Sequence, residues 1–133
     1  MTLIEKQERM IAEINALGDC FDQYSYLLVK AQELPDLTEA QKTDAALVPG
    51  CQSQVWLYVW TEFGRLRFEA DSDTLILRGV LQLLRELLDG EPVRDVTALD
   101  VRLFAETELA ATFTSDRNTG VKSILRRMQS IAE

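Results

Sequence analysis

The first third of the chain has apolar positions that recur with the period of an α-helix. Thr2 and Glu5 have the spacing of a capping box, and Gly18 is placed to end the helix that follows. Asp19 is placed to cap a second helix, which ends before Pro35. The inward positions of these two helices are Ile4, Ile11, Ile14 and Leu17, then Cys20, Tyr24, Leu27, Leu28 and Ala31.

The middle of the chain changes to the two-residue period of strands. Residues 54–62 are apolar on both faces, which predicts a central strand that is covered on both sides. Phe63-Gly64 is a turn, and residues 65–70 alternate cleanly, so the two segments form an antiparallel hairpin. Residues 45–48 could add a short third strand, and residues 38–42 a short helical turn.

The last third of the chain returns to helices. Residues 71–73 supply N-cap chemistry for a helix that Gly90 and Pro92 end. Gly79 lies inside this helix, which suggests either that another backbone packs closely there or that the glycine is merely tolerated. We expect one or two short helices over 100–111, a polar loop over 114–120, and a last helix with the apolar face Val121, Ile124, Leu125, Met128 and Ile131. The sum is one α+β domain over residues 1–133, a small antiparallel sheet of two or three strands packed with N- and C-terminal helices.

The charge and the cysteine content exclude some classes of function and indicate where the protein is located. The chain has 133 residues, 22 acidic and 14 basic side chains, and a formal net charge of -8. Such a surface repels phosphate backbones and argues against nucleic-acid binding. The longest wholly apolar run, residues 55–60, is too short to span a membrane, and the N-terminal residues do not follow the order of a signal peptide. Two cysteines at unrelated spacing indicate a reducing, cytoplasmic location.

The chain contains no histidine. This excludes a Cys-His dyad, a Ser-His-Asp triad and any histidine metal site. Two cysteines alone cannot complete the usual four-ligand zinc or iron–sulfur set. Cys20 falls on the inward stripe of its predicted helix, where a free thiol acts as a small buried hydrophobe.

Cys51 lies in a predicted loop at the entrance to the first strand. Gly50 permits a positive φ, and Gln52 and Ser53 can donate hydrogen bonds to a thiolate, which is the nucleophile in sulfur chemistry. No Lys, Arg or His neighbours Cys51 in sequence, so any activating charge has to come from elsewhere. From spacing alone, a loop cysteine without a role is the alternative.

The run of residues 48–57, VPGCQSQVWL, resembles the signature of the SufE family of sulfur acceptors. Weaker matches follow the family's order over residues 24–128. They are Tyr26-Leu27-Leu28 with Glu33-Leu34-Pro35, Ala70-Asp71-Ser72-Asp73 with Ile76 and Arg78-Gly79-Val80, and the segment 116–121 around Arg117. Where the family usually has Pro-Ser-Arg before the last helix, this chain has Ser115-Asp116-Arg117, which adds a negative neighbour that could pair with Arg117.

The resemblance implies a sulfur carrier with a fold like that of IscU-type scaffolds. Such proteins take sulfane sulfur as a persulfide on the loop cysteine, here Cys51, from a pyridoxal-phosphate-dependent cysteine desulfurase of the SufS or CsdA type. They stimulate that enzyme and pass the sulfur to an iron–sulfur scaffold complex or another acceptor. The carrier needs no cofactor of its own, since the pyridoxal phosphate belongs to the partner. Its transfer step is of the thiol–disulfide exchange class.

Two further residues are implied as partner contacts, each with a plainer alternative. Asp73 could contact the partner, or could be the N-cap of the helix that it precedes. Arg117 could lie near the cysteine loop or the partner, or be a helix-entry arginine. Monomer and homodimer both stay open.

Other classes of function fit the residues less well. A cysteine hydrolase lacks its histidine, a thiol oxidoreductase lacks a C-x-x-C pair, and a cluster scaffold lacks cysteine ligands. A non-catalytic adaptor stays as the alternative, with the face of Trp56, Tyr58 and Trp60 docking a partner and Cys51 incidental.

Overall fold

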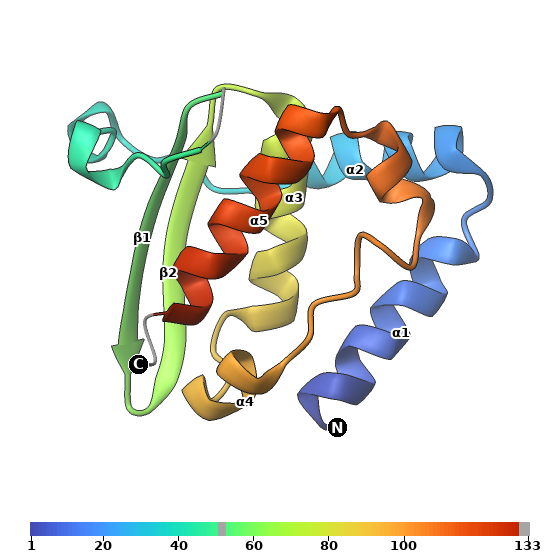
Figure 1. Cartoon of the computed structure of the whole chain (residues 1–133), viewed down its shortest axis with the longest axis horizontal. Helices are drawn as coiled ribbons and strands as arrows, with labels where there is room; N and C mark the ends of the chain where they lie inside the picture. The colour runs from blue at the N-terminus through green and yellow to red at the C-terminus, as the bar shows by residue number, and fades with distance from the viewer. Residues whose placement is uncertain (51–52, 131–133) are drawn as a thin grey trace.

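The structure is a computed structural model that describes residues 1–50 and 53–130. Figure 1 shows a β-hairpin packed with helices in layers. The hairpin stands on one side, α3 and α5 pack next to it, and α1 and α2 lie beyond α3. The α-helices are α1 (Leu3–Asn15), α2 (Cys20–Glu33), α3 (Leu75–Leu88), α4 (Val93–Ala98) and α5 (Ser115–Ser130). The strands are β1 (Val55–Glu62) and β2 (Arg65–Ser72), and the 3-10 helices are η1 (Glu39–Gln41), η2 (Asp44–Ala46) and η3 (Glu108–Thr112).

The predicted caps of α1 and α2 are confirmed. Thr2 with Glu5 and Asp19 with Asp22 each form a reciprocal capping box. The predicted inward face of α1 is partly wrong, because Ile4 and Leu17 are 57% and 44% exposed. Leu3 and Gln7 are buried in place of them. Gln7 can be buried because its side chain binds the backbone of Asp100 and Arg102 at 3.0 and 2.9 Å.

α2 shows the same kind of difference. Its buried residues are Gln23, Leu27 and Ala31, whereas Cys20 is only partly buried and Tyr24 is exposed. The amide of Gln23 binds Gly18 O at 3.2 Å and accepts Glu108 N at 2.8 Å. Buried glutamines that bind backbone groups therefore take core positions that a hydropathy pattern assigns to apolar residues. The expectation that Cys20 is a buried hydrophobe is wrong.

The sheet of the described residues has two strands, paired antiparallel from Val55↔Ser72 to Glu62↔Arg65. The predicted strand over 45–48 is wrong, because η2 occupies this segment and Leu47 makes only an isolated bridge to Trp56. β1 is therefore not central, and its outer face is covered near its start only. Trp56 packs under the 37–47 segment at 8% exposure, while Trp60 is 39% exposed.

α3 is the centre of the core. Ten of its residues are buried, and Gly79 lies against α2, which confirms the close approach that the glycine suggested. Its N-cap is Thr74 rather than Asp73. The short helix α4 was not predicted from the sequence because six residues are too few for a periodic pattern.

The expectations for residues 100–120 are partly wrong. Of the one or two short helices expected over 100–111, the structure has the 3-10 helix η3, which begins only at Glu108, and turns come before it. The segment 114–120 is not a loop, because α5 begins at Ser115 and the Thr114 hydroxyl accepts a hydrogen bond from Arg117 N at 3.2 Å. Only one side of α5 is buried, along Val121, Ile124 and Met128, so its polar first turns carry no apolar signal.

In the part of the chain that is described, no helix combines the length and apolar character needed to cross a membrane.

Candidate functional site

Cys51 and Gln52 lie outside the described residues, so the site is built from the two arms of the loop that holds them. Val48 N donates to Val55 O at 2.8 Å, and Leu47 bridges to Trp56. Residues 47–48 therefore pair with residues 55–56 at the start of β1. The described ends of the segment that contains Cys51 are thus held together.

The incoming arm is backed by α5. Gly50 has φ +87°, the left-handed region that the glycine permits. A Cβ at this position would be 2.8 Å from Ser123 Oγ. The residue directly before Cys51 therefore needs both a positive φ and a close approach to α5, and glycine satisfies both.

The outgoing arm is tied to the junction between β2 and α3. Gln54 N donates to Asp73 Oδ1 at 3.1 Å, and Gln54 O accepts from Ser72 Oγ at 2.8 Å. Ser53 Oγ accepts from Thr74 Oγ1 at 2.7 Å. These three hydrogen bonds hold Ser53 and Gln54 against the junction.

Asp73 is not the N-cap of α3, which its position in the sequence had suggested. It is exposed, and its Oδ1 accepts from Gln54 N and from Thr74 Oγ1 at 3.1 and 3.2 Å. The cap of α3 falls to Thr74, which makes no side-chain cap hydrogen bond. Asp73 therefore anchors the outgoing arm of the Cys51 loop.

A buried charge pair lies behind this anchor. Asp71 is 2% exposed, and its carboxylate accepts from Arg78 Nη1, from Ser72 N at 2.8 Å and from Leu37 N at 3.0 Å. Arg78 also donates to the carbonyls of Ala31 and Leu34, at 3.2 and 2.7 Å. The pair joins the end of α2, the start of α3 and the end of β2. Its positions match the family signature, but nothing in their spacing indicated that the two side chains meet.

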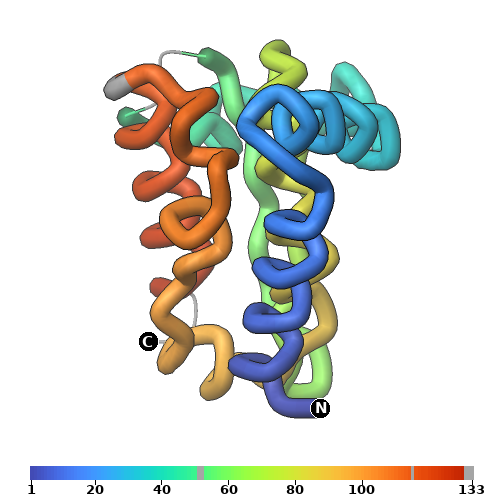
Figure 2. Tube along the Cα trace, turned by 90° about the vertical axis from the view of Figure 1, so that its right-hand side faces the viewer, coloured from blue at the N-terminus to red at the C-terminus, as the bar shows by residue number. Residues whose placement is uncertain are grey.

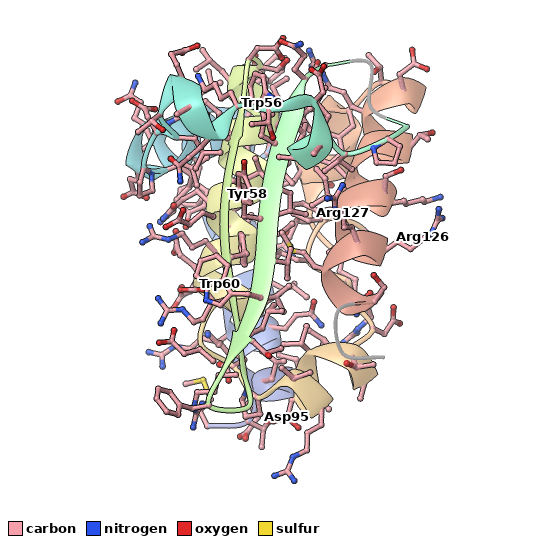
Figure 3. All side chains as sticks on the ribbon, turned by 90° about the vertical axis from the view of Figure 1, so that its left-hand side faces the viewer. Trp56, Tyr58, Trp60, Asp95, Arg126 and Arg127 are labelled. Atoms are coloured by element: carbon pink, nitrogen blue, oxygen red, sulfur yellow. The ribbon has the colours of Figure 1, made fainter. Side chains whose placement is uncertain are left out.

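α5 is a basic helix, and one of its cations, Arg127, reaches the loop. Residues 117–130 hold Arg117, Lys122, Arg126 and Arg127 and no acidic residue, in a chain of net charge -8. Arg127 donates to Leu47 O at 3.0 Å, on the incoming side of the loop. Figure 3 shows Arg127 directed toward β1 and Arg126 directed away from it. Arg127 was not predicted for the site because it is 76 residues from Cys51 along the chain.

Arg117 lies in the first turn of α5, where its backbone N–H binds Thr114. It forms no ion pair with Asp116, and both are described residues. The helix-entry position is thus observed, and a partner contact is neither required nor contradicted. Cys20, at the start of α2, is a free cysteine.

The fold is shared with a solved structure. The solution structure of a hypothetical protein from Thermus thermophilus superposes with a TM-score of 0.79 and covers 96% of this chain and 93% of its own, at 22% identity. At this identity the likeness establishes the fold, an α+β domain with a two-stranded antiparallel sheet.

The chain belongs to the SufE family. The family model, described as an Fe-S metabolism associated domain, matches residues 8–132. An uncharacterised SufE-like protein of Rhizobium etli is 32% identical over 131 residues, which are 95% of this chain and 88% of the relative. A second, of Rhizobium meliloti, is 30% identical over 131 residues, covering 95% and 94%. The family places the protein in iron–sulfur metabolism.

Proposed function

We propose that this protein is a cytoplasmic sulfur carrier that accepts sulfane sulfur on Cys51 from a pyridoxal-phosphate-dependent cysteine desulfurase. It stimulates that enzyme and delivers the sulfur to iron–sulfur cluster assembly. The observation that carries the proposal is the loop itself. Its arms are fixed at Val48–Val55 and at Gln54–Asp73, within a chain of the SufE family. The protein needs no cofactor for this role.

The transfer step is a two-electron exchange that needs no oxidant. The Cys51 thiolate attacks the outer sulfur of the persulfide on the desulfurase cysteine. A new S–S bond forms on Cys51, the partner's S–S bond breaks, and the partner cysteine leaves as a thiolate. A second attack, by a thiolate of the acceptor, unloads Cys51 in the same way.

Activation of the thiol is assigned to the complex with the desulfurase. Arg127, the cation bound to the incoming side of the loop, already donates to Leu47 O. The surrounding net charge of -8 disfavours a free thiolate. We expect Cys51 to react with iodoacetamide like an ordinary thiol in the isolated protein and faster in the complex. Fast alkylation of the isolated protein would contradict this assignment.

The adaptor alternative is favoured by one observation. Trp60 is 39% exposed, and it lines a cavity of about 220 Å³ with Leu34, Leu37, Arg67 and Arg85. A partner could dock there without any sulfur transfer. In that case Cys51 would be dispensable.

Desulfurase turnover separates the two functions. Alanine formation from cysteine is measured with no added chain and with wild type, Cys51→Ser or Cys20→Ser. A carrier predicts stimulation by wild type and Cys20→Ser and none by Cys51→Ser. Equal stimulation by Cys51→Ser would favour the adaptor.

A further inference from the structure

The outer edge of β2 has backbone groups that the described fold leaves unpaired. In an antiparallel pair the backbone groups of alternate residues point away from the partner strand, and in β2 these include Leu66, Phe68 and Ala70. Leu66 exchanges two hydrogen bonds with residues 90–91, at 2.8 and 2.7 Å, and Phe68 N donates to Asp89 Oδ1 at 3.2 Å. No described residue binds the C=O of Phe68 or either backbone group of Ala70. Ala70 is 3% exposed, and a buried backbone group without a partner is unfavourable, so this stretch is suited to pair with another chain.

A cavity lies along this open stretch. It has a volume of about 220 Å³ and is lined by the open stretch itself, by residues 34–37 and by Arg85 of α3. Residues 34–37 bind β2 only beyond the open stretch, where Leu37 N donates to Asp71 Oδ2 at 3.0 Å. Figures 1 and 2 show α2, which these residues follow, at the end of the molecule opposite the N-terminus. A cavity of about 150 Å³ holds benzene, so this one has room for a side chain with its carboxylate and not for a helix.

Arg85 is the charged residue of this cavity that has no partner in the described part of the chain. The cavity is lined by two acidic and two basic residues, Asp36, Glu69, Arg67 and Arg85. The first three contact other side chains, those of Arg78, Gln41 and Asp89, at 3.0, 3.1 and 3.2 Å. Glu86 and Asp89, the acidic residues that follow Arg85 in sequence, are paired with Lys30 and Arg67. The half-buried guanidinium of Arg85 makes no hydrogen bond or ion pair with any described residue, and it is suited to bind a carboxylate through two parallel hydrogen bonds.

The open backbone, the guanidinium and an aromatic ring lie at one level of the hairpin. Arg85 is one helical turn before Asp89, about 6 Å along the axis, and α3 runs opposite to β2 in Figure 1. Because Asp89 binds Phe68, Arg85 lies about two residues further along the strand, beside Ala70. Trp60 borders the same cavity from β1 and is 39% exposed. Figure 3 shows its side chain on the outer face of the hairpin.

We propose that this cavity binds the C-terminal residues of an extended peptide from another protein. The peptide adds to the open stretch of β2, where one of its residues exchanges hydrogen bonds with the N–H and C=O of Ala70. Its C-terminal carboxylate pairs with Arg85, and its last side chain, which is apolar, lies against Trp60. The site lies on the outer edge of β2, whereas Val48 pairs with the outer edge of β1. Binding therefore requires no sulfur on Cys51, and this proposal does not rest on the proposed function.

An NMR titration of the isotope-labelled protein with an acetylated tetrapeptide that ends in leucine tests the proposal. The matched ligand is the same peptide with a C-terminal amide, and N-acetylleucine represents a small-molecule carboxylate. We expect the acid peptide to shift the amide signals of Phe68 and Ala70 and to slow hydrogen exchange at Ala70 N–H. The amide peptide and N-acetylleucine should each bind about tenfold more weakly or worse.

Arg85→Gln should bind the acid and the amide peptides equally weakly. Its urea midpoint should stay that of wild type, because the Arg85 side chain has no partner among the described residues. The matched control is Arg126→Gln, which removes one positive charge from an exposed position of α5 and should bind like wild type. No change at Ala70 with millimolar acid peptide would overturn the proposal. So would equal affinity of wild type for acid and amide, or for the tetrapeptide and N-acetylleucine.

Discussion

A Cβ on Gly79 of α3 would lie 2.4 Å from the Leu27 carbonyl oxygen of α2. The two helices therefore approach so closely at this point that there is no room for a methyl group. Because α3 is the centre of the core, this contact fixes where α2 and the segment after it can lie.

Gly79→Ala should lower the free energy of unfolding. Helix propensity alone would favour alanine by about 1 kcal/mol. Steric overlap with Leu27 reverses this, and overpacked cores cost about 1–3 kcal/mol. Urea denaturation measures the difference. An alanine variant that is more stable than wild type would show that the helices are free to separate.

Asp71→Ala should be among the more destabilising single changes. Without Asp71, the carboxylate that stays with Arg78 is Asp36, whose Oδ1 is 3.0 Å from Nη2 on a side chain that is 82% exposed. Removing one partner of a buried pair costs about 3–5 kcal/mol, and we expect a loss near the lower end because Asp36 remains. The control is Glu106→Ala at the Arg102–Glu106 pair, whose side chains are 38% and 44% exposed. Such a surface pair contributes about 1 kcal/mol or less. Equal losses for the two variants, in the same urea experiment, would contradict the role given to Asp71.

Two substitutions of Asp73 distinguish its role as an anchor of the loop from a role as a charged contact with the desulfurase. If Asp73 acts through the hydrogen bond from Gln54 N, Asp73→Asn keeps an acceptor and Asp73→Ala removes it. We then expect several-fold slower sulfur loading for Ala and near wild-type loading for Asn. A charged contact with the desulfurase predicts instead that both variants are slowed alike, with a higher apparent KM for the carrier.

The capping box of α1 makes a small contribution to stability that depends on pH. Hydrogen bonds from the Thr2 backbone and side chain lower the pKa of Glu5. A carboxyl with a lowered pKa in the folded state stabilises the protein above its unfolded pKa, and this is lost as pH falls through the folded value. NMR titration should show a pKa below that of Glu5 in the unfolded chain. Thr2→Val should raise it, and an unchanged value would contradict the capping role.

The sequence predicted the α+β class, the hairpin and its turn because these have local signals. Strict alternation over 65–70 and the Phe63-Gly64 pair need no knowledge of the rest of the fold. The sequence-based prediction failed where a residue is surrounded by residues that are far from it along the chain. Gln7 and Gln23 are buried because backbone groups of residues 18 and 100–108 meet them. Residues 115–120 are helical although their polar side chains show no helical repeat of apolar positions.

The same limit applies to the candidate site. The Cys51 loop and the freedom of Gly50 follow from neighbouring residues, and the structure shows the positive φ at Gly50. The anchor between Gln54 and Asp73 and the contact of Arg127 with Leu47 O join elements that are far apart in sequence. No pattern along the chain indicates such pairs. Cys51 and Gln52 themselves, as site residues, stay predictions.

Intact-mass spectrometry after a single turnover with a cysteine desulfurase, pyridoxal phosphate and cysteine tests the central claim most directly. Wild type and Cys20→Ser should each gain one sulfur atom that a reductant removes, and Cys51→Ser should gain none. A sulfur atom on Cys51→Ser, or none on wild type in a stable complex with the desulfurase, would contradict the claim that Cys51 is the sulfur carrier.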